Sequence, residues 1–342
     1  MTNTRRQRIR ANTAGAKAKP TLDSRHGGGG HRSRERTRKG IERRVGWSRW
    51  AIPLTLVTVA LLGLVAWRMV SSNAGSDSVD DDSSARSIAT LDAPDFHSLL
   101  VDPQNPEHIF FGSHAGMQES QDGGFSWEAG ELRNADAMQL AVSPKAPETL
   151  YATGHDVFQV SRDGGHTWQP LAHNLPGTDI HGFAQDPLDP NRLYAFVTGA
   201  GTFTSVDGGT TWQSLPAQPP GGAMHLALAS SGTSLYAATE AGLVASSDQG
   251  VTWAALAAQP SGGVISLAIP ASDPRTIYAG TESGLATSAD GGASWKMLGP
   301  PGVLVLALAV APTDPSRVLF VSDEGAVYRS DTGGTTWRAP DA

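Results

Sequence analysis

The sequence contains no cysteine and lacks several of the short patterns that mark familiar active sites. Without cysteine the chain cannot form a disulfide, so a domain outside the cytoplasm has to be stable without one. The sequence also has no HExxH pattern, no closely spaced pair of metal ligands and no nucleophile elbow. Any site must therefore be assembled from residues that lie far apart in the chain.

Basic residues are scarce after residue 70. Residues 1–49 hold 15 of the 26 lysines and arginines against three acidic residues, whereas residues 71–342 hold 10 basic and 30 acidic side chains. The basic segment has almost no apolar side chains, so we expect residues 1–49 to form a disordered cytoplasmic tail. Two roles fit such a tail. It is attracted to anionic lipid, or it stays in water and its positive charge serves only to set the orientation of the membrane anchor. We expect no nucleic-acid partner.

Long hydrophobic runs are equally scarce, and one stands out. Residues 50–67 contain no charged side chain, and as a helix they would cover about 27 Å, close to the hydrocarbon core of a bilayer. Tryptophans lie at both ends of the run and arginines precede it. We expect residues 50–70 to be an uncleaved single-pass transmembrane anchor in the cell membrane, with the N-terminus in the cytoplasm; a cleaved signal peptide is the alternative. Residues 71–90, rich in Ser and Asp, then form an extended linker.

An eight-residue pattern, S-x-D-x-G-x-[ST]-W, recurs through the rest of the chain, and we call it the repeated turn. It occurs six times, as in "SRDGGHTW" ending at Trp168, and successive tryptophans are 41, 44, 41, 42 and 42 residues apart. A near-constant period of this size indicates one supersecondary unit repeated in space. In the sixth copy Thr332 replaces the aspartate and Asp331 lies one place early, so we expect a looser turn there.

Each repeat contains four short β-rich runs. In the first repeat they are residues 97–101, 108–112 and 116–120, with the fourth starting at Trp127. We therefore predict an all-β protein: a six-bladed β-propeller with four-stranded blades over residues 91–342, preceded by the disordered basic tail and the transmembrane helix. The chain starts at a first strand and ends just after a fourth, so exchange of a terminal strand is not evident. Residues 87–94 are the candidates for an extra strand.

The composition of the repeated turn predicts a structural role. Serine and aspartate side chains can bond turn amides, glycine supplies a positive φ, and the tryptophan is free to pack between neighbouring blades. A feature that is the same in every blade cannot single out one site. Tyr151, Tyr194, Tyr236 and Tyr278 recur at one strand position, which also indicates repeated packing.

With six such turns, residues 92–340 resemble the Asp-box (BNR) repeat propellers, which include sialidases, sortilin-type receptor domains and photosystem II assembly factors. The chain most resembles bacterial membrane-anchored members described as glycosyl hydrolase-like or assembly-factor-like. The resemblance implies the propeller fold and no single activity, because members range from glycosidases to non-enzymatic binders. A sialidase would need three arginines around its substrate; here Arg192, Arg275 and Arg317 lie on the side of the repeated turn and only Arg133 on the other, so we do not expect that apparatus.

The opposite side, which we call the channel-mouth face, is built from the connections before first strands and the hairpins between second and third strands. Six of the eight histidines beyond residue 90 map to it, and three aspartates precede first strands. The candidate ligand-binding residues are His97, His114, His155, His173, His181 and His225, with Glu240, Glu282 and Asp323 in the later hairpins. Asp95 and Asp179 precede His97 and His181 by two residues, which places each pair on one side of a strand.

Three functions fit this face. The first, which we favour, is a module that binds a protein or glycan partner, for which no cofactor is required. The second is a glycoside hydrolase whose catalytic carboxylates come from Asp95, Asp136 and Asp179. The third is a metal-dependent enzyme or metal sensor that holds a divalent ion through His97, His181 and His225. A single Asp and His pair can also be a satisfied imidazole that contacts the neighbouring blade.

Overall fold

The computed structural model describes residues 85–222, 225–228 and 232–338, with the side chains of residues 225–228 left out of the description. The predicted tail (1–49), the predicted transmembrane helix (50–70) and residues 71–84 of the predicted linker (71–90) lie outside the described residues. Across the ranges that are described, no helix is long and apolar enough to cross a membrane.

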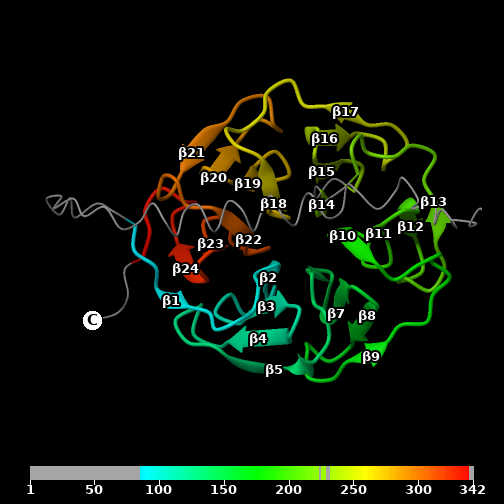
Figure 1. The fold of residues 1–342 in the computed structure, drawn as a ribbon, viewed down its shortest axis with the longest axis horizontal. Coiled ribbons are helices and arrows are strands. Elements are labelled where there is room, and N and C mark those ends of the chain that lie inside the picture. The colour runs from blue at the N-terminus through cyan, green and yellow to red at the C-terminus, as the bar shows by residue number, and fades with distance from the viewer. Residues whose placement is uncertain (1–84, 223–224, 229–231, 339–342) are drawn as a thin grey trace, which may run out of the picture. The chain divides into compact units, whose positions relative to one another are not determined.

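The described residues form six antiparallel sheets of four strands each (Figure 1). Blade one contains β2 (Ser98–Val101), β3 (Ile109–Ser113), β4 (Gly116–Ser120) and β5 (Glu128–Arg133). Blade two contains β6 (Gln139–Ser143), β7 (Ala146–Gly154), β8 (Val157–Ser161) and β9 (Gln169–Pro170). Blade three contains β10 (Ile180–Gln185), β11 (Leu193–Val197), β12 (Gly201–Ser205) and β13 (Gln213–Ser214).

The remaining three blades repeat this order. Blade four contains β14 (His225–Leu228), β15 (Leu235–Thr239), β16 (Gly242–Ser246) and β17 (Ala254–Ala255). Blade five contains β18 (Val264–Ala268), β19 (Ile277–Thr281), β20 (Gly284–Ser288) and β21 (Lys296–Leu298). Blade six contains β22 (Val305–Val310), β23 (Val318–Ser322), β24 (Ala326–Ser330) and, from the N-terminal side of the propeller, β1 (Ala89–Thr90).

The first strands form the inner wall of a closed ring. Strands β2, β6, β10, β14, β18 and β22 each contact the next, and β22 contacts β2 (Figure 1). The predicted all-β, six-bladed propeller with four-stranded blades is therefore confirmed. Because a ring places first strands at its centre, one end of each of these strands opens at the mouth of a common channel.

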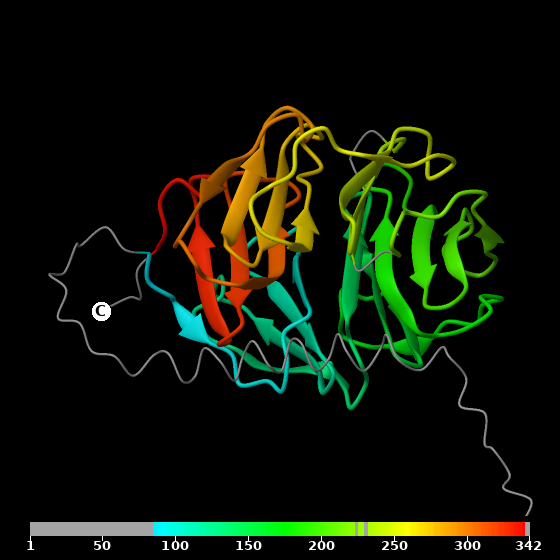
Figure 2. The same cartoon turned by 45° about the horizontal axis from the view of Figure 1, so that its top comes forward.

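Ring closure uses the extra strand predicted within residues 87–94. Strand β1 pairs antiparallel with β24, Ala89 lying opposite Val327, and the flanking Ile88 amide donates to the Val327 carbonyl at 2.8 Å. Figures 1 and 2 both show the cyan β1 beside the red β24. The expectation of no exchange of a terminal strand was wrong, because β1 joins the outer edge of blade six, where the Arg338 amide, just after Trp337, also donates to the Arg329 carbonyl at 2.8 Å. The propeller also begins inside the segment expected to be linker.

Apolar clusters between adjacent blades hold the ring together. In each cluster the tryptophan of a repeated turn packs at the interface between its own blade and the preceding one. Trp212, for example, joins Tyr151 and Phe183 between blades two and three. The Tyr151 hydroxyl also donates to the Gly208 carbonyl of the next blade at 3.3 Å. The interpretation of the repeated tryptophans and tyrosines as packing residues agrees with these contacts.

The repeated turn satisfies its own polar groups. In blade two, Asp163 Oδ1 accepts the Ser161 hydroxyl and the Thr167 amide, both at 2.8 Å, and Oδ2 accepts the Thr167 hydroxyl at 2.6 Å. These hydrogen bonds, led by that from the Thr167 hydroxyl, lower the pKa of Asp163 to about 2. The Gly164 and Gly165 φ angles of 73° and 97° lie in the left-handed region that favours glycine. The motif is thus a way of turning the chain.

In the sixth turn both residues that depart from the pattern, Thr332 and Asp331, form polar contacts. Thr332 Oγ1 accepts the Thr336 amide at 2.9 Å, so a hydroxyl takes the place of the carboxylate. Asp331 instead accepts Arg317 Nε at 3.2 Å and Arg329 Nε at 3.1 Å. Both arginines also reach Glu107 of blade one, at 2.7 Å and 2.8 Å. These contacts form an ion-pair network across the seam where blade six meets blade one.

His108, just before β3, gives blade one a pH-dependent contribution to stability. It is buried, and its Nδ1 and Nε2 each lie 3.2 Å from a carboxylate oxygen, of Asp102 and Glu119 respectively. Burial alone would lower the pKa of His108, but Glu119 and then Asp102 outweigh it and raise the pKa above the ordinary value. The folded state therefore holds this proton more tightly than the unfolded chain does.

We expect these contacts to stabilise the fold fully below about pH 6.5, the ordinary histidine pKa, and to lose that contribution as the pH rises through the raised pKa of His108. The measurement is the free energy of unfolding by urea at pH 6 to 9 for the wild type and for His108→Gln. The difference between the two should shrink as the pH rises. A difference that stays constant, or grows, would contradict this assignment.

Candidate functional site

Hairpin geometry brings aspartates and histidines together at the channel-mouth face. In blade one the Asp95 carboxylate accepts the His114 amide at 2.8 Å and lies 2.5 Å from its Nδ1. In blade two Asp136 Oδ2 accepts the His155 amide at 3.0 Å and lies 2.6 Å from its Nδ1. Each aspartate precedes a first strand and each histidine lies 19 residues later, in the hairpin after the second strand. One blade thus supplies both halves of each pair.

The first strands add two more histidines. His97, just before β2, has its Nε2 3.4 Å from Asp95 Oδ1. His181 in β10 has its Nε2 2.9 Å from Asp179 Oδ1. In blade three the hairpin position carries Thr198, whose amide donates to the Asp179 main-chain carbonyl at 2.9 Å.

Contacts between blades join these pairs into one row. His114 Nε2 lies 3.7 Å from Asp136 Oδ2, and His155 Nε2 lies 3.3 Å from His181 Nε2 and 3.5 Å from Asp179 Oδ1. We call this row the histidine ridge. Its members are Asp95, His97, His114, Asp136, His155, Asp179 and His181. The ridge runs over three consecutive blades, and three overlapping groups within it could each hold a metal ion.

In blades one and two the carboxylates form a base that is less exposed than the histidines, which form the crest of the ridge. The Asp136 side chain is 11% exposed, whereas those of His114 and His155 are 43% and 49% exposed. Burial, followed by the neighbouring His114, lowers the pKa of His97, which favours its neutral imidazole. Asp136 Oδ1 accepts no hydrogen bond from any residue that the structure describes. The crest therefore presents imidazole edges to solvent above carboxylates that the fold holds in place.

Some residues expected at this site lie apart from the ridge. His173 packs its ring against Phe158, with centroids 5.2 Å apart, and its Nδ1 accepts the Leu175 amide at 3.2 Å. Burial lowers the pKa of His173. His225 begins β14, but its side chain lies outside the described residues, so the trio of His97, His181 and His225 stays a prediction.

The other three blades place carboxylates where blades one and two have histidine. Glu240 and Glu282 are exposed and Asp323 is half-buried, each in the hairpin after the second strand of its blade. The Glu282 amide donates to the Gly263 carbonyl, and the Asp323 amide to the Leu304 carbonyl, both at 3.2 Å. Because glycine and leucine replace the aspartates there, these hairpins have no equivalent of the Asp and His pairs. The hairpins after the second strands therefore differ around the mouth, with histidine in blades one and two and a carboxylate in blades four to six.

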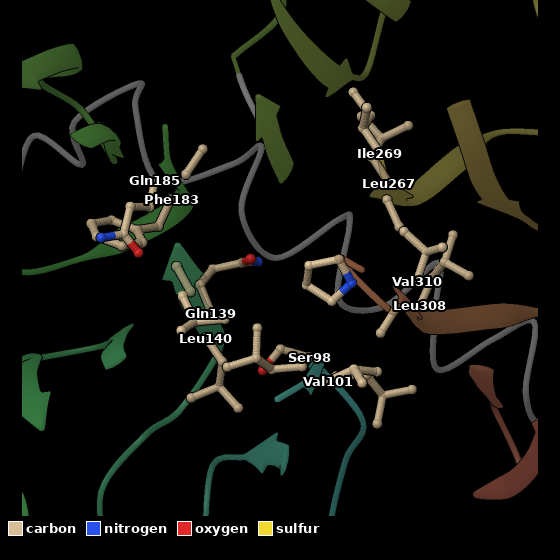
Figure 3. Close-up of a pocket in the computed structure, with 18 of the residues that line it drawn as sticks. Ser98, Val101, Gln139, Leu140, Phe183, Gln185, Leu267, Ile269, Leu308 and Val310 are labelled. Carbon is tan, nitrogen blue, oxygen red and sulfur yellow. The ribbon is translucent and has the colours of Figure 1, made fainter. Parts of the chain in front are cut away.

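Below the ridge, the first strands enclose a cavity of about 170 Å³. Its lining is mostly aliphatic, and Figure 3 shows Leu308 and Val310 on the side of the channel opposite Gln139. Sequence reasoning missed Gln139, whose Nε2 donates to the His181 carbonyl at 3.5 Å and so links β6 to the ridge strand β10. The sequence did contain a signal for Gln139. At the equivalent strand position blades one and five carry the small residues Ser98 and Ser266, so a long polar side chain stands out there.

Comparison with protein families gives a match to a propeller. The DUF6242 beta propeller domain family matches residues 149–275 and 188–301, which together span less than half of the chain. No curated protein matches the sequence.

Solved structures share the fold at low identity. A GH74 xyloglucanase from Xanthomonas campestris is 20% identical with a TM-score of 0.54; the alignment covers 74% of this chain and 46% of the xyloglucanase, so the chain spans about half its length. A putative gluconolactonase is 15% identical with a TM-score of 0.58, over 78% of this chain and 97% of its own. YCF48 from Cyanidioschyzon merolae is 19% identical with a TM-score of 0.49, over 73% and 87%. These are similarities of fold.

Proposed function

We propose that the propeller is a binding module that holds a protein or glycan partner against its channel-mouth face. In this proposal residues 50–70 tether it to the cell membrane, residues 1–49 lie in the cytoplasm beside anionic lipid, and the propeller lies outside the cytoplasm. The observation that carries the proposal is the histidine ridge, a row of partly exposed imidazoles oriented by aspartates across three blades.

The two ends of the propeller differ in what they offer to a partner. At the repeated turns the aspartate oxygens are already used, as Asp122 shows by accepting the hydroxyls of Ser120 and Ser126. At the channel mouth, His114 and His155 keep close to half of their side-chain surface exposed. An exposed group that can both donate and accept hydrogen bonds is suited to recognition. The mouth is therefore the better binding surface.

Charge adds to this preference. Glu240, Glu282 and Asp323 in the remaining hairpins complete a rim of hydrogen-bond acceptors. Such a rim favours partners that present hydroxyl groups or basic side chains, because complementary charge steers encounter and sets specificity. The candidate catalytic carboxylates Asp95, Asp136 and Asp179 each already contact an imidazole. We therefore assign Asp95 and Asp136 an orienting role.

The repeated turn also supports assigning the chain to the Asp-box propellers. In five of its six copies the aspartate accepts one hydrogen bond from the first serine and another from the hydroxyl of the last Ser or Thr. In that family the fold serves both binders and glycosidases, so the assignment agrees with a binding role without requiring it.

Affinity capture from native membranes tests the proposed function. The full chain is expressed as wild type, as His114→Gln/His155→Gln, and as His166→Gln, which alters an exposed histidine in a repeated turn. Proteins and glycans recovered with each are compared by quantitative mass spectrometry. We expect a partner whose recovery falls about tenfold or more in the double variant, a loss of about 1.4 kcal/mol or more, and is unchanged in His166→Gln. Equal recovery with all three would contradict the proposal.

A further inference from the structure

We propose that the third-blade end of the histidine ridge is a divalent transition-metal site formed by His155 Nε2, Asp179 Oδ1 and His181 Nε2, with zinc as the expected ion. The inference goes beyond partner binding and stands without it, because it rests on the geometry of three ligand atoms. It also differs from the trio expected from the sequence, since His181 is the one residue the two sets share.

The three ligand atoms already have the spacing that a metal imposes. They form a triangle with edges of 3.5 Å (His155 to Asp179), 2.9 Å (Asp179 to His181) and 3.3 Å (His155 to His181). Ligands bonded to zinc at about 2.0 to 2.1 Å in a tetrahedron lie about 3.3 Å from one another. An ion can therefore bind with little movement of the side chains.

Hydrogen bonding on the far side of His155 leaves the correct nitrogen free. His155 Nδ1 lies 2.6 Å from Asp136 Oδ2, so Nδ1 carries the proton and Nε2 presents its lone pair to the site. A carboxylate that holds a metal-binding imidazole in this way is the usual arrangement in zinc proteins. The Asp136 side chain is nearly buried, which keeps His155 in a fixed orientation.

The environment of Asp179 Oδ1 is a second feature that suits a cation. Its Oδ1 is shielded from solvent and accepts no hydrogen bond from the described residues, although His181 Nε2 lies only 2.9 Å away. A shielded carboxylate oxygen that accepts no hydrogen bond is less favourable than one that does, because it has exchanged contact with water for weaker contacts. Coordination of a cation would satisfy this oxygen.

The other two groups of the ridge fit a metal less well. In the group of Asp95, His97 and His114, the His114 nitrogen that faces the others is 2.5 Å from Asp95 Oδ2, a hydrogen-bond distance. In the group of His114, Asp136 and His155, the Asp136 oxygen and the His155 Nδ1 are already bonded to each other. In the third-blade group the three ligand atoms lie 2.9 to 3.5 Å from one another, and the contact between His155 Nε2 and His181 Nε2 at 3.3 Å is a hydrogen bond that an ion would replace once His181 Nε2 has lost its proton.

Ligand chemistry narrows the choice of ion. Two imidazoles and one carboxylate suit zinc, and also cobalt, nickel or copper, whereas magnesium and calcium prefer sites made of oxygen alone. The three side chains are 36% to 49% exposed, so a fourth position stays open to solvent. Water or a donor group from a bound partner can take that position.

Calorimetric titration with zinc tests the inference on the full chain, purified in detergent without a histidine tag. His26→Gln and His31→Gln are present throughout, so that the histidines of the N-terminal segment do not bind the ion. After removal of metal by a chelator, we expect one zinc ion per chain, with His166→Gln unchanged. Cobalt added in place of zinc should give a visible absorption spectrum of a nitrogen and oxygen site.

Matched variants locate the ion. His155→Gln and His181→Gln should each remove the saturable binding, and Asp136→Asn, which keeps all three ligands, should weaken it about 10- to 100-fold. Each variant is checked for an unchanged unfolding midpoint, and Asp179→Asn replaces any that fails to fold. Absence of a saturable ion, or unchanged affinity in the folded ligand variants, would overturn the inference. Partner capture is measured separately, so either proposal can fail alone.

Discussion

Replacement of Ile88 and Leu91 by alanine in the full chain should lower the free energy of unfolding by about 4 kcal/mol or more. Both side chains are buried, 7% and 4% exposed, in the cluster between blades six and one. Truncation of a buried Leu or Ile typically costs about 2 to 5 kcal/mol. The substitutions also weaken β1, whose loss would leave the β24 edge unpaired. Urea unfolding followed by tryptophan fluorescence measures the effect.

The matched control is Leu188→Ala. Leu188 is 54% exposed, so its truncation should change the stability by no more than about 0.5 kcal/mol. A total stability of about 5 to 15 kcal/mol is usual for a domain, so opening the ring would remove a large part of it. A double variant as stable as the control would show that β1 does not close the ring.

Replacement of Arg329 by methionine should destabilise the seam by about 3 kcal/mol, the lower end of the range for breaking a buried ion pair by removing one partner. The Arg329 side chain is only 5% exposed and contacts both Glu107 and Asp331. Its loss leaves these two carboxylates close together with less positive charge between them. We place the effect at the lower end because Glu107 is 42% exposed and remains partly solvated.

Arg338→Met is the control for this prediction, because Arg338 contacts the same carboxylate from a solvated position. Its side chain is 56% exposed and its Nε lies 2.5 Å from Asp331. Exposed ion pairs contribute about 1 kcal/mol or less, so this variant should unfold at nearly the wild-type urea concentration. Equal losses of stability in the two variants would contradict the prediction that the buried Arg329 stabilises the seam more than the exposed Arg338 does.

The fold was predictable because its signals are local. Each repeated turn closes through hydrogen bonds that span four residues or fewer, as between Asp163 and Thr167, so sequence alone reveals the period and the blade count. Ring closure was harder, because Ala89 pairs with Val327 and no local pattern marks that partnership. Residues 87–94 could be named as candidates only because they lie next to the first repeat.

The candidate site was predictable in composition but not in pairing. The sequence placed histidines and aspartates at one face, but it paired Asp95 with His97, whereas the shortest contact joins Asp95 to His114. Asp95 and His114 are 19 residues apart and meet only because the chain folds back on itself between them. The alternation of side chains along a single strand gives no information about such a contact. His173 has the same residue type, yet its ring packs on Phe158 and lies outside the ridge, since that outcome depends on a loop conformation.

Photo-crosslinking from opposite ends of strand β12 tests the central claim most directly. A photoreactive residue is introduced in cells at Thr198, an exposed hairpin residue beside Asp179, or at Val206, which is 61% exposed in the repeated turn of the same blade. We expect a specific crosslinked partner from position 198 that disappears with His114→Gln/His155→Gln, and none from position 206. Crosslinking from position 206 alone, or from neither position, would contradict the assignment of the channel-mouth face as the binding surface.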